Sequence, residues 1–324
     1  MSEKKFKLFD FNKDGKGVSK YEDDGPPNIV GFFKQYKRKF SRLISVNIFM
    51  VLGCFPLFFY GFYLAGYGAN EVAVQSNILF PAIDAFSNLA PSPVTASLTN
   101  VYGISGYFTF NTVVSYIFYA LTFLILFTWG PMNVGTSYIM RNLCKGDPVF
   151  MWSDFWYAIK RNVKQGIIIG IIDLIAIYLF VFNVGFYYAR IANGTFLAGI
   201  MFYASLAMLI IYFYMRFYMY ILLVKFDLSI FKILKNSLIF SIIGFKRNFM
   251  ATLGILALIV LNFMLFLFIQ PLGIVMPLVL TIANCAFMAT YAAWFKIKEI
   301  MIDPYAEESD EDSEAPIAVD DVTE

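Results

Sequence analysis

Long runs of apolar residues, nearly free of charged side chains, alternate with short basic segments along this chain. Because an α-helix rises about 1.5 Å per residue, about 20 apolar residues cross the roughly 30 Å hydrocarbon core of a bilayer. There are five such runs, and the last one, 248–295, is long enough for two crossings and a turn. The pattern therefore predicts an all-α membrane protein with six transmembrane helices. Their expected ranges are 43–66, 111–140, 165–188, 197–222, 249–269 and 274–295.

The lysine and arginine residues lie almost entirely on one side of these runs. Eleven precede the first run, five separate the second from the third, six lie between the cores of the fourth and fifth, and two follow the last. Only Arg190 falls in a segment on the opposite side. Since basic residues stay next to the cytosol during membrane insertion, we expect both termini in the cytoplasm. Segment 67–110 is then a long outer loop, which suits a small subdomain or a partner surface.

The composition is typical of this class of protein. The chain has 324 residues, of which 59% are hydrophobic, and its mean hydropathy of +0.66 is too high for a soluble domain of this size. The formal net charge is only +2, and no basic patch stands apart from the apolar runs. We therefore expect the lipid bilayer, and not nucleic acid, as a partner.

Several kinds of chemistry are excluded by the residues that the chain lacks. It has no histidine, which removes histidine general bases, Ser-His-Asp triads and histidine metal ligands. Cys54, Cys144 and Cys285 are isolated, without metal-ligand spacing or a disulfide framework. The apolar runs contain no pair of carboxylates and no Gly-x-Ser-x-Gly motif. We therefore predict no enzyme activity, no cofactor and no metal site.

The two ends of the chain differ from the transmembrane domain, which is expected over 43–299. Residues 1–27 are polar and are expected to be flexible, and the acidic tail 300–324 is expected to be disordered. Residues 10–15 imitate the start of an EF-hand loop, but Tyr21 stands where such a loop needs glutamate. We interpret this stretch as a solvated turn.

Three amphipathic segments are predicted at the cytoplasmic face. Residues 28–42 combine aromatic and aliphatic residues at helical spacing with five basic residues, which indicates a basic helix in the headgroup layer. The alternative is a basic cluster without a defined helix. Ranges 147–162 and 228–246 are expected to form surface helices that lead into the third and fifth crossings. In the first of these, Asp147 and Pro148 suit the cap and first position of a helix.

Each of these two surface helices ends in the tripeptide Lys-Arg-Asn, at 160–162 and again at 246–248. The repeated order of crossing, surface helix, tripeptide and crossing predicts a parallel internal duplication. The alternative is that basic residues simply mark the cytoplasmic ends of helices.

The second crossing is longer than one perpendicular span requires, and Gly130 and Pro131 interrupt it. Proline removes a backbone donor and clashes with the preceding turn, so we expect a kink or helix break at this point. A broken helix with small polar residues can line a substrate cavity. The alternative is a tilted helix that packs on its neighbours through Gly135.

Asp173 and Arg216 are the charged residues inside the predicted crossings. Each stands nine residues from a lysine at the cytoplasmic end of its helix, about 13 Å along the helix axis. An unpaired charge at that depth costs roughly a few kcal/mol or more. We therefore predict an intramembrane ion pair, with a gating or relay role, and expect exchange of the two charges to rescue the single variants. Alternatively, Arg216 snorkels to inner phosphates and Asp173 meets water or a hydroxyl group.

Several stretches of the chain resemble a known family. The most specific one holds Gly130-Pro131, Val134-Gly135, Arg141-Asn142, Trp152-Ser153-Asp154-Phe155 and Lys164-Gln165-Gly166. With Phe32-Phe33 and the stretch 15–20, these residues make the chain similar to YesL-like proteins, a bacterial integral membrane family known as a domain of unknown function. The resemblance implies a multi-pass protein of the bacterial plasma membrane, often encoded near carbohydrate ABC importers. The family offers no catalytic or binding residues to transfer.

Two functions are open at this point. We predict an accessory or regulatory component associated with carbohydrate (ABC-type) uptake, which contacts importer subunits. The alternative is a solute transporter or permease in its own right, which the interruption at 130–131, the duplication and the buried charges favour. Against the alternative, intramembrane polar residues are sparse, and neither basic inner segment contains the Glu-Ala-Ala tripeptide that importer permeases offer to their ATPase.

Overall fold

The computed structural model describes residues 28–74, 79–102, 106–191, 194 and 196–304. The predicted segment 1–27, with its EF-hand-like turn, and the tail beyond residue 304 lie outside this part. In chain order, the elements are α1 (Ile29–Gly53), α2 (Pro56–Leu64), β1 (Ala69–Val74), α3 (Phe80–Leu89), α4 (Pro93–Tyr102), β2 (Gly106–Asn111), α5 (Val113–Thr122), α6 (Ile125–Lys145), α7 (Met151–Ile191), α8 (Phe196–Lys225), α9 (Ile230–Ile243), α10 (Phe245–Phe268), α11 (Gln270–Met276), the π-helix η1 (Pro277–Thr281) and α12 (Ile282–Met301).

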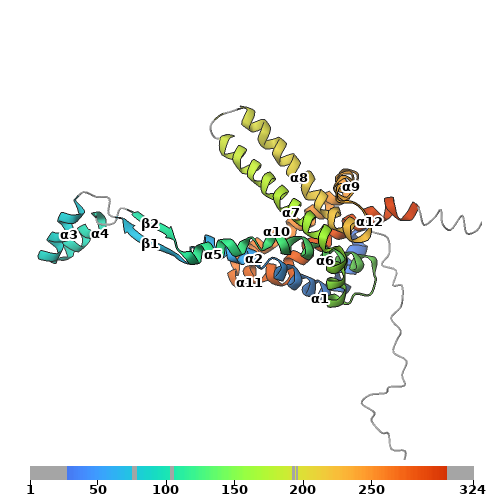
Figure 1. Cartoon of the computed structure of the whole chain (residues 1–324), viewed down its shortest axis with the longest axis horizontal. Helices are drawn as coiled ribbons and strands as arrows, with labels where there is room; N and C mark the ends of the chain where they lie inside the picture. The colour runs from blue at the N-terminus through green and yellow to red at the C-terminus, as the bar shows by residue number, and fades with distance from the viewer. Residues whose placement is uncertain (1–27, 75–78, 103–105, 192–193, 195, 305–324) are drawn as a thin grey trace, which may run out of the picture.

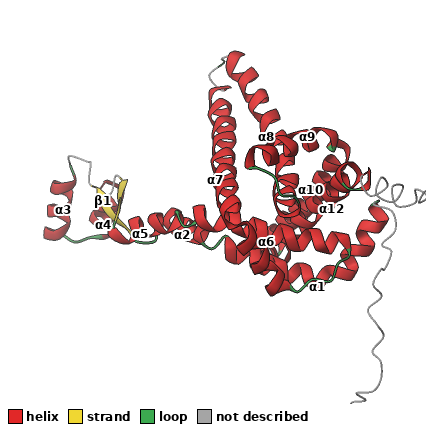
Figure 2. Cartoon of the chain, turned by 45° about the vertical axis from the view of Figure 1, so that its right-hand side comes forward, coloured by secondary structure: helices red, strands yellow, loops and turns green. Residues whose placement is uncertain are grey.

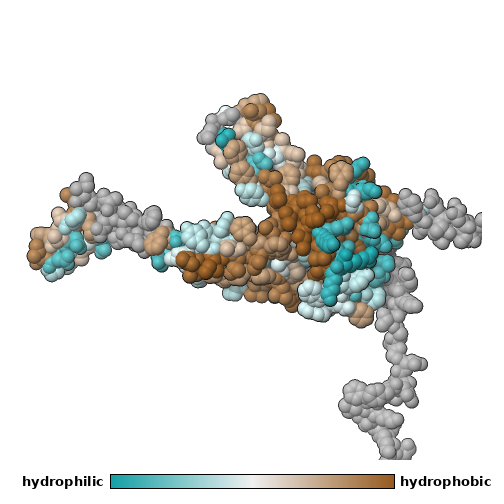
Figure 3. Space-filling model, in the orientation of Figure 1, coloured by the Kyte–Doolittle hydropathy of each residue, from teal (hydrophilic) through white to brown (hydrophobic). Residues whose placement is uncertain are grey.

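Five helical stretches in the described part are long and apolar enough to cross a membrane, and the pair α1–α2, bent by 60°, gives a sixth if it forms one span. Large apolar side chains are exposed along them. On α10, for example, Leu256, Val260 and Phe263 are 51%, 55% and 54% exposed, and apolar surface covers much of the helix bundle in Figure 3. Because such surfaces are unfavourable in water, the structure indicates a multi-pass membrane protein.

Two projections extend from one helix bundle (Figure 1). The bundle contains α1, α6, α9, α10, α12 and the adjoining ends of α7 and α8. The first projection is the hairpin of α7 and α8. The second is an arm in which α2 and α5 lead to the β1–β2 ribbon and to α3 and α4 at its tip. The same arrangement is visible after a 45° turn (Figure 2).

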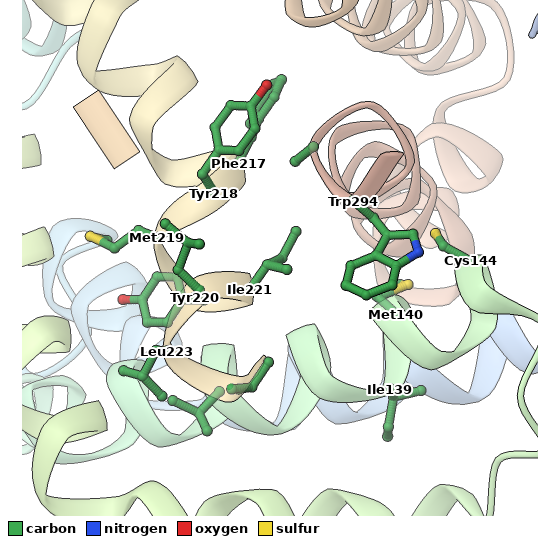
Figure 4. Packing of buried hydrophobic residues seen from close by; sticks show 14 of the residues in the cluster. Ile139, Met140, Cys144, Phe217, Tyr218, Met219, Tyr220, Ile221, Leu223 and Trp294 are labelled. Carbon is green, nitrogen blue, oxygen red and sulfur yellow. The ribbon is translucent and has the colours of Figure 1, made fainter. Parts of the chain in front are cut away.

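The core of the bundle lies where the second half of α8 meets α6, α9 and α12. Residues 217–224 of α8 are all buried, which a lipid-facing helix does not show. Tyr218 and Leu222 have no exposed surface. In Figure 4 this part of α8 faces Trp294 of α12 and Met140 of α6. The end of α8 therefore forms the centre on which the other helices pack.

The basic segment 28–42 is helical and continues without interruption into the first apolar run as α1. Its buried side holds Gln35 and Lys39, whose side-chain nitrogens donate to the carbonyls of Cys144 (3.1 Å) and Leu143 at the end of α6. The last carbonyls of a helix lack partners within the helix and carry the negative end of its dipole. This half of α1 thus packs on protein and caps α6, in addition to any contact with headgroups.

The end of α6 explains why the next helix starts later than predicted. Gly146 adopts a left-handed φ of 89°, its N–H bonds to Leu143 O, and the N–H of Asp147 bonds to Asn142 O (3.1 Å). These two bonds form a Schellman motif. Because the backbone N–H of Asp147 belongs to the motif that ends α6, Asp147 does not cap the next helix. Helix α7 therefore begins at Met151 and not at 147–148.

The two Lys-Arg-Asn tripeptides lie at equivalent joints between a surface helix and a crossing. Asn162 has non-helical φ and ψ angles (−119°, 17°) and marks a kink inside α7. Asn248 follows the break at Gly244 between α9 and α10, and accepts a hydrogen bond from Tyr218 (2.7 Å). The kink falls within the first tripeptide and the break precedes the second, so the duplication stays a prediction.

The predicted outer loop 67–110 folds into the arm. β1 and β2 pair antiparallel with Ala69 opposite Asn111 and Val74 opposite Gly106. α3 and α4 have ten residues each, about half the length that a crossing needs.

The final hairpin is tighter than predicted. Helix α11 already begins at Gln270, so the turn lies at Ile269 and not over 270–273. A Cβ on Gly273 would lie 2.2 Å from Phe266 Cα, so only glycine allows α11 to lie this close to α10.

A single asparagine supports the π-helical segment after Pro277. Asn47 of α1 is fully buried. Its Nδ2 donates to the carbonyls of Pro277 (3.0 Å) and Leu278 (2.7 Å), and its Oδ1 accepts from Ala283 N (2.8 Å). π-Helical geometry and proline both disturb the regular backbone ladder. The Asn47 amide therefore bonds to backbone groups of the last crossing at the point where its regular ladder changes.

We expect Asn47→Leu to lower the free energy of unfolding by about 1–3 kcal/mol, because three hydrogen bonds between the buried side chain of Asn47 and the last crossing are lost. Unfolding of the purified protein in detergent, followed by circular dichroism, measures this change. Asn183→Leu is the matched control, because Asn183 is on an exposed part of α7 and bonds to Leu179 O of its own helix. Equal effects of both substitutions would contradict the role given to Asn47.

Candidate functional site

Asp173 of α7 lies at the centre of a buried polar cluster. Its side chain has no exposed surface. Tyr212 OH donates to Oδ1 (2.7 Å), while Tyr220 OH (3.0 Å) and Trp129 Nε1 (2.8 Å) donate to Oδ2. Arg216 Nε lies 2.9 Å from Oδ1 and 3.2 Å from Oδ2. The structure thus brings Asp173 and Arg216 together, and we call these five residues the Asp173 cluster.

Three members of the Asp173 cluster come from one face of α8. Tyr212, Arg216 and Tyr220 are spaced four residues apart, so they lie one above the other on the helix. The sequence pattern identifies Arg216 but not the two tyrosines. Their spacing of four residues from Arg216 in an apolar helix is the signal that could have indicated them. Asp173 therefore meets the guanidinium of the predicted pair and also hydroxyl groups, which belong to the second alternative.

A carboxylate offers about four acceptor positions, and the Asp173 cluster fills them. Burial of a carboxylate without partners costs several kcal/mol, and an ion pair alone offsets this cost poorly when its remaining acceptor positions are empty. Here Trp129, Tyr212 and Tyr220 supply three neutral donors beside Arg216 Nε. The cluster is consequently a saturated network, in which the buried carboxylate of Asp173 has a donor at each acceptor position.

Glycines bring α6 close enough to α7 for Trp129 to reach Asp173. A Cβ on Gly130 would lie 2.0 Å from Gly166 O, and a Cβ on Gly170 would lie 2.4 Å from Gly130 Cα. Gly166 and Gly170 form a small-xxx-small pattern on α7, which permits close contact between membrane helices. Asp173 follows on the same face. The glycine contact and the carboxylate are therefore parts of one α6–α7 interface.

The helix break predicted at Gly130 and Pro131 is not present, since α6 runs through both residues. The interruption lies one to two turns earlier, between α5 and α6, where Leu126 N and Phe127 N bond to carbonyls three residues back (3.1 and 3.0 Å). Proline at 131 removes only the bond to Phe127 O, near the start of the helix. The alternative, that α6 packs on its neighbours through Gly135, agrees with the structure, because a Cβ at Gly135 would lie 2.5 Å from the Phe155 ring of α7.

A cavity of about 270 Å³ lies beside the Asp173 cluster, bounded by α1, α6, α8, α10 and α12. Trp129, Arg216 and Tyr220 belong to both the cluster and the cavity lining. The Arg216 side chain is 27% exposed while that of Asp173 is fully covered, so the cation and not the carboxylate faces the cavity. The guanidinium carbon lies 5.5 Å from the centre of the Trp129 ring, a distance at which cation–π attraction operates.

Comparison with known proteins identifies one similarity. A family model described as "Protein of unknown function, DUF624" matches residues 108–184, a range that holds α5, α6 and most of α7, with Trp129 and Asp173. No curated protein and no solved structure matches the chain. The chain is thus a multi-pass membrane protein with a region similar to a family of unknown function.

We expect Gly130→Ala to destabilise the protein by about 1–3 kcal/mol, because the added methyl group meets backbone of α7 and not a movable side chain. Thermal unfolding in detergent tests this. Gly185→Ala is the matched control: it is also in an apolar helix, but a Cβ there meets nothing within 4 Å, so its stability should be unchanged or slightly higher.

We expect Tyr212→Phe and Tyr220→Phe each to lower stability by about 1–3 kcal/mol, because each removes one donor to a buried charge. Tyr203→Phe on the same helix, where the residue is 70% exposed, should have little effect. The same unfolding assay applies, and equal stability of all three variants would argue against a saturated carboxylate.

The structure also changes the expectation for exchanging the two charges. An arginine at position 173 would place its N–H groups against Trp129, which is only a donor. The variant with Asp173→Arg and Arg216→Asp is therefore expected to stay as defective as the single variants.

Proposed function

We propose that the chain crosses the bacterial plasma membrane six times, with both termini in the cytoplasm. Contacts between basic segments support this topology, because they tie the predicted cytoplasmic helix ends to one another. Lys39 donates to Leu143 O, Arg141 donates to Val224 O (3.5 Å), and Arg247 pairs with Glu299 (3.0 Å). Hydrophilic side chains gather on this end of the molecule in Figure 3. The arm extends from the opposite end (Figure 1).

A reporter inserted after Ser87 in α3 tests the topology. We expect alkaline phosphatase to be active at this position, because it folds outside the cytoplasm, and green fluorescent protein to be dark. The same reporters inserted after Asp227, between α8 and α9, should give the reverse result. An intracellular signal after Ser87 would overturn the orientation.

For the function, we propose an accessory component of carbohydrate ABC-type uptake that works through contacts with importer subunits. The observation that carries this proposal is the arm, because it presents apolar side chains away from the bundle. Leu89, Val101 and Val94 are 85%, 70% and 68% exposed at its tip. In the proposed topology the tip stands beyond the bilayer, where lipid does not cover these side chains, and apolar surface of this kind suits a protein contact. The YesL-like resemblance supplies the class of partner, and the proposal gives the protein no catalytic role.

Copurification from native membranes tests the accessory role. We expect tagged protein to retain importer subunits, and Leu89→Asp with Val101→Asp to release them, because the charges remove apolar contact from the arm. Asn88→Asp with Asn100→Asp is the matched control, since it adds the same two charges at exposed polar positions of α3 and α4. Unchanged copurification with the double variant would contradict a contact through the arm.

A permease is the second candidate, and the cavity beside Arg216 favours it. The two roles differ in what the isolated chain can do. Liposomes that contain only this chain should show no sugar flux if it is an accessory protein. Flux without any importer subunit would overturn the accessory role and support the permease.

A further inference from the structure

The cavity beside the Asp173 cluster has the chemistry of a binding site. Its lining is mostly apolar, with side chains such as Met132, Phe213, Phe217 and Ile255. The polar part of the lining is confined mainly to α6 and α8 around Arg216. Such a cavity, apolar with a few convergent polar groups, is typical of small-molecule sites.

Several polar groups of the lining already have hydrogen-bond partners. Asn133 Nδ2 donates to Trp129 O (2.8 Å), and Thr136 Oγ1 donates to Met132 O (2.8 Å). Arg216 is different. It contacts Asp173 through Nε, and within the described residues no hydrogen-bond acceptor is recorded for its two terminal nitrogens. The strongest free donors beside this cavity are therefore the Nη groups of Arg216.

The charge of Asp173 does not occupy those donors. Three neutral groups, from Trp129, Tyr212 and Tyr220, share the carboxylate with Nε. The planar guanidinium presents paired N–H groups that match carboxylate and phosphate oxygens. An ionisable group facing a membrane cavity also marks a ligand path or site more often than a structural accident.

We propose that this cavity binds an amphiphile with one anionic group, a carboxylate or a phosphate, which bonds to the Nη groups of Arg216. The apolar body of the amphiphile lies along the apolar side chains of α6, α8 and α10. A membrane lipid and a soluble anion share this chemistry. The site is separate from the arm and does not depend on the proposed accessory role.

Quenching of tryptophan fluorescence by a brominated probe tests the proposal, because Trp129 lines the cavity. The protein is placed in phosphatidylcholine nanodiscs and titrated with 8-bromooctanoate or with the neutral 8-bromooctanol. We expect half-maximal quenching at an about tenfold lower concentration of the carboxylate, since a hydrogen bond to a charged group contributes about that factor. Equal potency of the two probes would overturn the proposal.

Substitutions that fill the cavity locate the site while leaving the Asp173 cluster intact. Ala289→Leu should abolish the advantage of the carboxylate, because Ala289 lines the cavity. Ala257→Leu, at an exposed position of α10, should retain it. If Ala289→Leu does not fold, Ala286→Leu at another lining position replaces it. The proposal would be overturned if 8-bromooctanoate still quenched a folded cavity-filling variant at a lower concentration than 8-bromooctanol, by the same factor as in the wild type.

Native mass spectrometry distinguishes the two sources of the ligand. The protein is purified from membranes that contain phosphatidylglycerol. Retention of this lipid by the wild type, and its loss from Ala289→Leu, supports the site with a membrane lipid as ligand. Carboxylate-dependent quenching without a retained lipid supports the site with a soluble anion as ligand.

Discussion

The buried carboxylate of Asp173 requires donors on every side, and this requirement determines how three helices pack. One donor comes from α6 and three come from a single face of α8. Any shift of α8 along its axis would separate at least one of the groups at 212, 216 and 220 from its acceptor. The charge therefore restricts the alignment of α7 and α8, which apolar packing alone would leave free to slide.

The same interface shows why small residues and a charge occur together. Without Gly166 and Gly170, the α6 backbone could not approach α7, and the Trp129 indole would stop short of Asp173. In lipid, helix association depends on close packing and on hydrogen bonds more than on apolar burial. The α6–α7 contact uses both, and it falls within the region that is similar to a family of unknown function.

Much of this architecture is predictable from apolar runs and the two isolated charges, because crossing length and burial of charge are strong constraints. The ends of elements were less predictable. Gly146 moves the start of α7 to Met151, and Pro131 fits inside α6, because tertiary packing and local hydrogen bonds override residue preferences. The tyrosine donors were missed because tyrosines are abundant in this chain and only their partner gives these two a distinct meaning.

The bond between Asn47 and the π-helical segment has a consequence for biogenesis. Asn47 and its partners are about 230 residues apart in the chain. During synthesis, the amide of α1 is therefore made long before the carbonyls of Pro277 and Leu278 that accept its hydrogen bonds. During that interval the amide lacks its native partners. The native contact can therefore form only after the last crossing has been made.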